Sequence, residues 1–251
     1  MGKIIAITGA GDGLGRALAR RFAKDGDIVI LLGRTWSKVE AVVAELGAPH
    51  MAVLCDVGDA ASVNAAFAQI AAVHPKIDVL INNAAVFVPF KLADATDAQI
   101  MALTMTNFVG PILVSRAALP LLRSDDAKTG GHIINLSSES VRLQMPMLWL
   151  YTAAKQGVEM LSEMWQHELK ADNIRVTVVR AGQMMDETKT ASSWPREVSM
   201  AFAMANAEVG LKLIERPISH YNSATDVFHA VVNLPADLHV GMVTLSADRR
   251  V

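Results

Sequence analysis

Short apolar runs alternate with helix-like segments along almost the whole chain. Continuous apolar runs bounded by turn residues are typical of strands buried on both faces. They occupy residues 3–8, 27–32, 51–54, 77–81, 131–136, 174–179 and 242–245. Between them, apolar residues recur every three or four positions, which predicts helices over about 14–23, 36–46, 59–73, 97–123 and 151–170. This alternation predicts an α/β fold, with a doubly wound parallel sheet of about seven strands and helices on both faces.

The expected helix 97–123 contains an irregular stretch. Asn107 and the pair Gly110-Pro111 interrupt its apolar pattern. Sharp bends in helices usually have an identifiable cause such as proline or glycine. A local kink is therefore predicted near the middle of this helix.

Composition favours one large domain over residues 1–251. The chain is 52% hydrophobic and 19% charged, which predicts a sizeable core rather than disorder. No change of composition separates two parts of the chain, and no internal repeat of solenoid length is present.

Charge and cysteine content exclude several classes of function. The net charge is -2 without a basic block, so no nucleic-acid partner is expected. Cys55 is the only cysteine, and no histidines are spaced as HExxH, so we expect neither a disulfide nor a metal site. The N-terminus lacks a long apolar signal region and no apolar run has transmembrane length, which predicts a cytoplasmic protein without membrane contact.

A glycine-rich stretch lies between the first expected strand and the first expected helix. It reads Thr8-Gly-Ala-Gly-Asp-Gly-Leu-Gly15. Gly9 allows a tight turn, and Gly13 and Gly15 allow a phosphate to approach the backbone at the helix N-terminus. A purely structural turn is the alternative, but the position between strand and helix favours a nucleotide.

The end of the second expected strand bears on the choice between NAD(H) and NADP(H). An acid at this point would bind the 2′-hydroxyl of NAD, whereas an arginine accommodates the 2′-phosphate of NADP. Gly33 stands where the acid would be and Arg34 follows it, which favours NADP(H). Asp12 in the glycine loop argues the other way, because a nearby carboxylate would repel a 2′-phosphate.

Tyr151 and Lys155 carry the candidate chemistry. Residues four apart on a helix lie one turn apart on the same face. A free tyrosine has a pKa of about 10, and a neighbouring ammonium favours the phenolate. A decrease of ~3 units would require roughly 4 kcal/mol. By itself the YxxxK pattern also fits a half-buried tyrosine and a solvated lysine.

Five features in order resemble the short-chain dehydrogenase/reductase family. They are the glycine stretch, Asp56, Asn82-Asn-Ala, Ser138 thirteen residues before Tyr151, and the YxxxK pair, and the resemblance runs from Lys3 to about Leu245. It implies a Rossmann-like fold and an NADP(H)-dependent oxidoreductase. Hydride would move between the nicotinamide and a small-molecule carbonyl or secondary alcohol. It also implies a homodimer or homotetramer formed through the helices that bear Asn107 and Tyr151.

The resemblance also implies residue roles. Tyr151 is the general acid/base, Ser138 binds the reacting oxygen, and Lys155 lowers the Tyr151 pKa and binds the nicotinamide ribose. Asn107 holds a water in the proton relay, while Ser137 faces the other side of its strand. Tyr151 and Lys155 also belong to the implied cofactor-binding set, whose other members are Thr8, Gly9, Asp12, Gly13, Leu14, Gly15, Arg34, Asp56, Val57, Asn83, Ala84, Ala85, Ala181, Gly182 and Met184.

Three positions depart from the family pattern. Ala85 stands where the asparagine motif usually ends in glycine, and Ala181 replaces the proline before Gly182. Asp186 occupies the place of a threonine that commonly lies near the carboxamide, with Thr188 as a possible substitute. These changes bear on cofactor pose more than on catalysis. They keep open a non-catalytic nucleotide-binding regulatory or scaffold protein, and chemistry without net redox, such as epimerisation, is a further alternative.

Two methionine-rich segments are expected around the substrate. Methionine suits irregular apolar pockets, and the apolar residues concerned are Val141, Leu143, Met145, Met147, Leu148, Trp149, Met184, Met185, Trp194, Met200, Phe202 and Met204. They favour an apolar ketone or aldehyde, although lid packing or a subunit interface would explain them equally well. Arg142 or Arg196 could bind an acidic group, with solvated arginines as the alternative.

Overall fold

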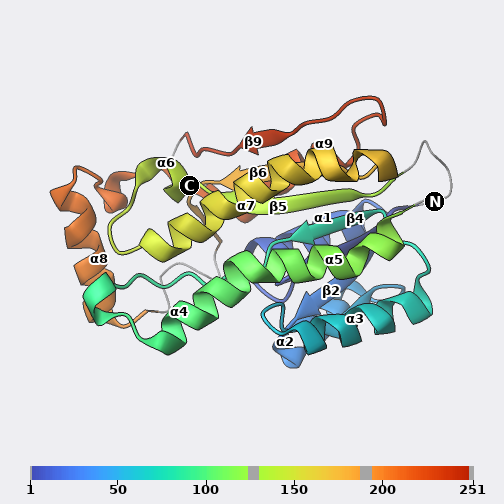
Figure 1. The fold of residues 1–251 in the computed structure, drawn as a ribbon, viewed down its shortest axis with the longest axis horizontal. Helices are drawn as coiled ribbons and strands as arrows, with labels where there is room; N and C mark the ends of the chain where they lie inside the picture. Colours follow the sequence, from blue (N-terminus) through green and yellow to red (C-terminus); the bar gives the residue numbers. More distant parts are fainter. Residues whose placement is uncertain (1, 124–129, 187–193, 249–251) are drawn as a thin grey trace.

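Seven parallel strands form the central sheet. The structure is a computed structural model that describes residues 2–123, 130–186 and 194–248. Within these residues the sheet order is β3-β2-β1-β4-β5-β6-β9 (Figure 1). Its strands are β1 (Ile4–Thr8), β2 (Ile28–Gly33), β3 (Met51–Leu54), β4 (Val79–Asn82), β5 (His132–Ser138), β6 (Arg175–Ala181) and β9 (Met242–Thr244). The predicted doubly wound sheet is confirmed.

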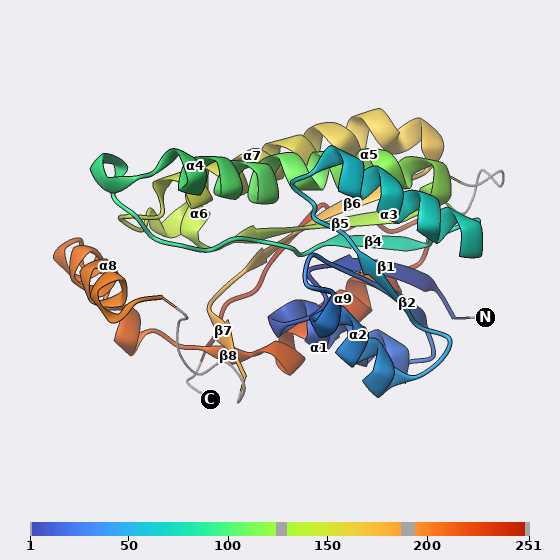
Figure 2. The same ribbon diagram turned by 90° about the horizontal axis from the view of Figure 1, so that it is seen from below.

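Helices cover both faces of the sheet, as Figure 2 shows from below. One layer contains α1 (Gly13–Lys24), α2 (Trp36–Leu46) and α9 (Tyr221–Val232). The other contains α3 (Ala60–Val73), α4 (Asp97–Thr104), α5 (Gly110–Leu122) and α7 (Trp149–Glu168). Each layer has its own buried cluster: Ile5 and Ile7 of β1 point into the first, and Ala6 points into the second. Burial on both faces explains why the strands are continuously apolar.

The strand order reverses direction between β1 and β4. Ile5 of β1 lies opposite Val29 of β2 on one side and Val79 of β4 on the other. The crossovers from these two strands leave in opposite directions, so a crevice opens at their carboxyl ends. In doubly wound sheets, ligands bind at such a point.

The predicted kink in the helix 97–123 is a turn of π-helix. α4 ends at Thr104, residues Met105–Val109 form the π-helical turn, and α5 begins at Gly110. Such turns widen the helix locally and often occur at functional sites. The stretch Asp97–Leu122 has the length and mean hydropathy of a membrane span. It nevertheless packs on α3 and α7 as one of the helices covering the sheet.

The segment after β6 contains small elements that the apolar pattern does not predict. β7 (Met184–Met185) and β8 (Ser219–His220) form a two-stranded parallel sheet, with α8 (Arg196–Glu208) between them in the sequence. Two-residue strands are too short for periodicity to register. The remaining short helices are η1 (Leu92–Asp94), α6 (Ser140–Leu143), η3 (Leu169–Asp172) and η4 (Leu213–Glu215). α8 lies beyond the end of the sheet, beside the carboxyl ends of its strands (Figure 1).

Candidate active site

A cavity of about 870 Å³ lies at the carboxyl ends of the central strands. Its wall includes residues that follow β1, β2, β4, β5 and β6, together with parts of the segment after β6. It therefore coincides with the crevice at the reversal of strand order. Most of the predicted site residues meet there: Gly9, Asp12, Gly13, Leu14, Arg34, Asp56, Val57, Asn83, Ala84, Ala85, Ser138, Tyr151, Lys155, Ala181, Gly182 and Met184.

The glycines of the first loop have different tasks. Gly9 has φ +66, and a Cβ there would lie 2.9 Å from Ala84 Cα. A Cβ on Gly15 would lie 2.3 Å from the Gly9 carbonyl oxygen, so Gly15 is required by packing inside the loop. Of the two glycines expected to admit a phosphate, only Gly13, at φ +51, lines the cavity. The expectation that Gly15 lets a phosphate approach the backbone stays a prediction.

Thr8 is a structural residue rather than a part of the cavity wall. Its Oγ1 accepts hydrogen bonds from the backbone N–H groups of Asn83 at 3.0 Å and Ala84 at 3.1 Å. The Asn83 side chain returns a bond to the Thr8 carbonyl at 2.9 Å. These bonds join the ends of β1 and β4 and so hold the cavity floor together.

Gly13 and Lys38 both bind the Asp12 side chain. Its carboxylate accepts from the Gly13 N–H at 2.8 Å, which caps α1, and from Lys38 Nζ at 3.0 Å. Lys38 belongs to α2 and lines the cavity with the exposed Arg34. Sequence reasoning missed Lys38, although its position one turn after Arg34 could have suggested it. The Asp12 carboxylate, expected to oppose NADP(H), thus has a cation beside it.

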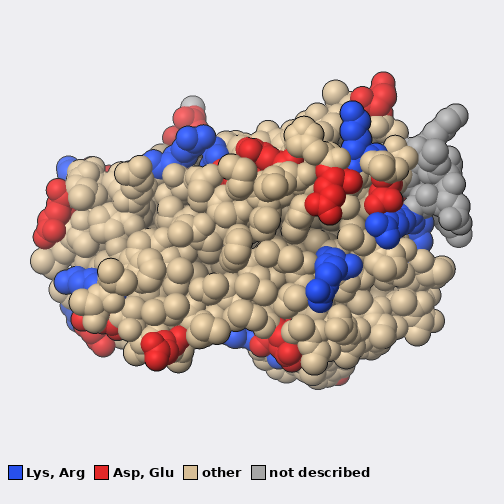
Figure 3. All heavy atoms as spheres, viewed as in Figure 1, with Lys and Arg blue, Asp and Glu red and all other residues tan. Residues whose placement is uncertain are grey.

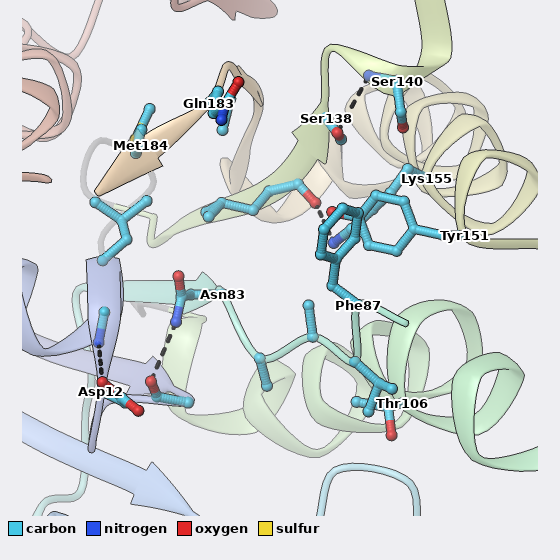
Figure 4. A pocket seen from close by; sticks show the side chains of 18 of the residues that line it. Asp12, Asn83, Phe87, Thr106, Ser138, Ser140, Tyr151, Lys155, Gln183 and Met184 are labelled. Carbon is cyan, nitrogen blue, oxygen red and sulfur yellow. Dashed lines mark hydrogen bonds between the residues drawn. The ribbon is translucent and has the colours of Figure 1, made fainter. Parts of the chain in front are cut away.

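Catalytic-type groups gather where β5 ends and α7 begins (Figure 4). Lys155 is buried, and its Nζ donates to the Leu136 carbonyl at 2.8 Å and lies 5.8 Å from the centre of the Tyr151 ring. The Ser140 N–H donates to Ser138 Oγ at 3.2 Å. Because that bond occupies a lone pair of the Ser138 oxygen, the hydroxyl proton stays available to a second acceptor.

Burial is the largest influence on the pKa values of Tyr151 and Lys155. It raises the pKa of Tyr151 to about 12, against a lowering hydrogen bond with Ser138 and with a further increase from the Glu139 carboxylate. Burial also lowers the pKa of Lys155 to about 8. A decrease in the Tyr151 pKa caused by Lys155 was expected, but in this structure the pKa of Tyr151 is raised. At neutral pH the phenol therefore keeps its proton, as a general acid must.

Ser137 is among the residues that line the cavity, and its side chain joins a buried ion pair. Arg180 Nε and Nη2 donate to the two Glu159 oxygens at 2.9 and 2.7 Å, and Ser137 Oγ donates to Glu159 Oε1 at 2.5 Å. All three residues are buried. The network ties α7 to β5 and β6 next to the catalytic-type groups. Sequence reasoning missed it, because no spacing signals a pair of residues that meet only through packing.

Asn107 lies in the π-helical turn and does not line the cavity. It is fully buried, its Oδ1 accepts from the Val86 N–H at 2.8 Å, and its Nδ2 donates to the Val86 carbonyl at 2.6 Å. The side chain therefore holds the segment that follows Ala85. Its role in a proton relay stays a prediction.

The departures from the family pattern leave the cavity open. Ala85, Ala181 and Gly182 all line it. Asp186 forms an ion pair with Arg16, with Arg16 Nη2 3.5 Å from Asp186 Oδ2, so its charge is compensated. Thr188 lies outside the described residues.

An aromatic wall covers the Tyr151 side of the cavity. The ring of Phe87 meets the Tyr151 ring at 4.9 Å in an edge-on arrangement and the Trp194 ring at 5.1 Å. Trp194 also packs edge-on against Phe202 at 5.6 Å, and its Nε1 donates to the Phe87 carbonyl at 3.0 Å. Met145 continues the apolar surface. Sequence reasoning identified Trp194 and Phe202 but missed Phe87, which simply continues an apolar stretch.

Other expected substrate residues lie elsewhere. Met200 and Met204 are exposed on α8 and do not line the cavity, and neither do the exposed Arg142 and Arg196. A helix presents only one face to a given surface, which is why Met200 and Met204 of α8 point outward while Phe202 is buried. Besides Arg34, Arg216 lines the cavity, and it forms an ion pair with Glu139.

Metal ligands are not grouped at this site. Among residues 2–123, 130–186 and 194–248, no cluster of three or more His, Cys, Asp or Glu side chains could hold a metal ion. Cys55 is buried, and burial raises the pKa of its thiol to about 12.

Comparison with known proteins identifies the family. The model for short chain dehydrogenases matches residues 3–198. D-xylose 1-dehydrogenase of Caulobacter vibrioides is 36% identical over 196 residues, which cover 77% of this chain and 75% of that protein. An uncharacterised oxidoreductase of Methylorubrum extorquens is 29% identical over 94% of this chain and 91% of its own length.

Solved structures show the same fold. A short-chain dehydrogenase from Streptomyces avermitilis superimposes with a TM-score of 0.82 at 24% identity, over 98% of this chain and 89% of the other. An alcohol dehydrogenase from Thermococcus sibiricus in complex with 5-hydroxy-NADP gives 0.81 at 21% identity, over 100% and 98%. The glycine loop, the cavity at the strand ends and the Ser138, Tyr151 and Lys155 groups fit a nicotinamide dinucleotide. This chain therefore belongs to the short-chain dehydrogenase/reductase family and is an NAD(P)-dependent enzyme acting on alcohol and carbonyl groups.

Proposed function

We propose that the enzyme transfers hydride between NADP(H) and an apolar ketone or aldehyde, or the corresponding alcohol, with Tyr151 as the general acid/base. The observation that carries the proposal is the placing of Ser138, Tyr151 and Lys155 in one cavity with an aromatic wall. The polar groups can bind the reacting oxygen, and the rings can bind an apolar group attached to the same carbon.

The protein's share of the reaction is position and one proton. The Tyr151 phenol donates to the substrate oxygen as it gains charge, and the Ser138 hydroxyl, oriented by the Ser140 N–H at 3.2 Å, donates to the same atom. The bound cofactor supplies or accepts the hydride. Lys155, held at the Leu136 carbonyl, places a cation near the phenol and stabilises the phenolate that remains after proton transfer.

NADP(H) is favoured by the cations at the end of β2. Arg34 is exposed at the cavity wall, and Lys38 lies on the same wall. Asp12, which would repel a 2′-phosphate, is paired with Lys38 at 3.0 Å. The local balance at this corner is therefore positive, as recognition of an additional phosphate requires.

We also propose a cytoplasmic homodimer or homotetramer. The face formed by α4, α5 and α7 carries few charges across its centre (Figure 3). Met101, Met160 and Met164 are exposed on it. An apolar surface of this kind favours association through the two long helices.

The alternative is a nucleotide-binding protein without turnover. The experiment that separates the two measures NADPH and NADH oxidation with a panel of apolar ketones, aldehydes and small hydroxy acids, for wild type and Tyr151→Phe. Turnover of apolar ketones by wild type only would support the enzyme proposed here. Better turnover of the polar substrates would refute the apolar pocket. Tight cofactor binding without any turnover would favour the binding protein, and product formation without net oxidation would indicate non-redox chemistry.

A further inference from the structure

Tyr221 brings a hydroxyl to the glycine loop from the opposite end of the chain. It is the first residue of α9, which packs beside α1 in the same helical layer. A Cβ placed on Gly13 would lie 3.5 Å from the Tyr221 hydroxyl oxygen and 3.6 Å from Cζ. The ring packs against the buried cluster that contains Leu18 and Phe228, so its position is set by the core rather than by a loop.

The Tyr221 hydroxyl has no hydrogen-bond partner within the described part of the chain. Tyr221 lines the cavity and is only partly exposed, and no group among the described residues hydrogen-bonds its hydroxyl. Burial raises the pKa of Tyr221, and the carboxylates of Asp186 and Asp12 raise it further. The phenol therefore remains protonated over the physiological range. The hydroxyl proton is therefore available to an acceptor bound in the cavity.

Cations compensate the two nearby carboxylates. Lys38 Nζ lies 3.0 Å from Asp12 Oδ2, and Arg16 Nη2 lies 3.5 Å from Asp186 Oδ2. An anion above Gly13 thus meets a helix N-terminus and a neutral donor instead of two uncompensated negative charges.

We propose that the Tyr221 hydroxyl binds the diphosphate of the nicotinamide dinucleotide over Gly13. The inference rests on the proposed function, since it needs a dinucleotide in this cavity. Phosphates bind at the N-terminus of the first helix of such sheets, which is the position that Gly13 begins. The neighbouring loop hydroxyl of Thr8 cannot serve, because it is buried and already bonded to Asn83 and Ala84. α9 thus supplies a donor that the glycine loop lacks.

The test compares binding of two ligands that share the diphosphate. Affinities for NADPH and for ADP, which ends at the diphosphate and lacks both the nicotinamide and its ribose, are measured by calorimetry on wild type, Tyr221→Phe and Tyr151→Phe. The last variant is a matched control, because it removes the same hydroxyl from the chain's other tyrosine. Tyr221→Phe is expected to weaken both ligands to a similar degree, roughly tenfold, since a hydrogen bond to a charged group is lost. Tyr151→Phe should leave ADP within about twofold of wild type, because ADP lacks the part of the cofactor that Tyr151 is expected to contact.

Three results would overturn the assignment. Tyr221→Phe could bind both ligands as wild type does, or it could lose affinity for NADPH alone, which would place the hydroxyl near the nicotinamide. Tyr151→Phe could weaken ADP as strongly as Tyr221→Phe does, which would make the effect non-specific. The proposed function is separable, because it fails only when wild type binds neither ligand or does not turn over. Thermal unfolding of the ligand-free variants shows whether the fold itself has changed.

Discussion

The two halves of the cavity are built in different ways. The half assigned to the cofactor is shaped by backbone: a positive-φ turn at Gly9, a helix that begins at Gly13 and the ends of parallel strands. The half assigned to the substrate is shaped by side chains from distant segments, with Phe87 against Trp194 and Arg216 against Glu139. Backbone geometry tolerates few residue types, whereas an apolar wall can be packed in many ways. The first half is therefore specified by local motifs, and the second is not.

The largest expected effect lies where the two halves meet. Tyr151→Phe should lower turnover by about 10²–10⁴-fold, because the phenolic proton has no substitute. NADPH binding should persist, since the ring and its contact with Phe87 remain. Steady-state kinetics beside fluorescence titration of NADPH tests this. Undiminished turnover would show that Tyr151 takes no part in the chemistry where the two halves of the cavity meet.

The buried ion pair beneath both halves should govern stability rather than selectivity. Glu159→Gln should cost about 3–5 kcal/mol of unfolding free energy, because it leaves the Arg180 guanidinium buried without its counter-ion. The double variant Glu159→Gln/Arg180→Met should recover part of that loss. Urea denaturation of the three proteins measures this. If the single variant shifted substrate preference at unchanged stability, the pair would have to be counted with the substrate half.

Arg34 tests how the cofactor half distinguishes NADPH from NADH. Arg34→Ala should weaken NADPH binding roughly tenfold or more, because a charged hydrogen bond to the 2′-phosphate is lost, and should leave NADH nearly unchanged. Lys38→Ala is the matched comparison: it loses a cation from the same wall and also removes one partner of Asp12. KM values for NADPH and NADH, measured on wild type and both variants, test the assignment of Arg34 to the 2′-phosphate. An equal effect of Arg34→Ala on NADH would contradict the phosphate assignment.

Trp194 tests whether the aromatic wall of the substrate half binds an apolar ketone. Trp194→Ala should raise KM for an apolar ketone roughly tenfold, because ring contacts with Phe87 and Phe202 are lost along with apolar contact area. The dissociation constant for NADPH should not change. Met204→Ala, a truncation on the exposed side of α8, is the control and should be silent. A large effect on cofactor binding instead would mean that the aromatic wall belongs to both halves.

The smallest expected effect concerns pH. The pKa of Tyr151 is raised to about 12 by burial and then by Glu139, so little phenolate exists at pH 7 and alcohol oxidation should accelerate as pH rises. Glu139→Gln removes a negative charge, favours the phenolate and should move the rise of the oxidation profile to lower pH, with a gain of a few-fold at pH 8. Arg216→Gln, which leaves Glu139 unpaired, should move the profile the opposite way. Identical pH profiles for all three proteins would show that the pair acts on structure alone.

The local motifs predicted most of the residues that line the cavity near the glycine loop, but not what each of them contacts. The spacing of glycines predicted a phosphate loop, and packing also requires Gly15, because a Cβ there would lie 2.3 Å from the Gly9 carbonyl oxygen. Thr8 was expected to bind the cofactor and Asn107 to hold a water in the proton relay, and the structure shows that both bond to neighbouring backbone. One sequence pattern serves loop packing and ligand binding alike, so spacing alone cannot assign which residue does which.

The sequence by itself determined the strand and helix alternation and the glycine loop, because each rests on local periodicity or on a residue type that backbone geometry demands. The Ser138, Tyr151 and Lys155 set followed from the family resemblance. Only the tertiary structure decided that Lys38 pairs with Asp12 and that Glu159 forms a buried ion pair with Arg180. It also decided that Phe87 and Tyr221 line the cavity. The two ion pairs join residues that are 26 and 21 positions apart along the chain. Packing of whole helices against the sheet brings them together, and no local pattern encodes where that packing places a side chain.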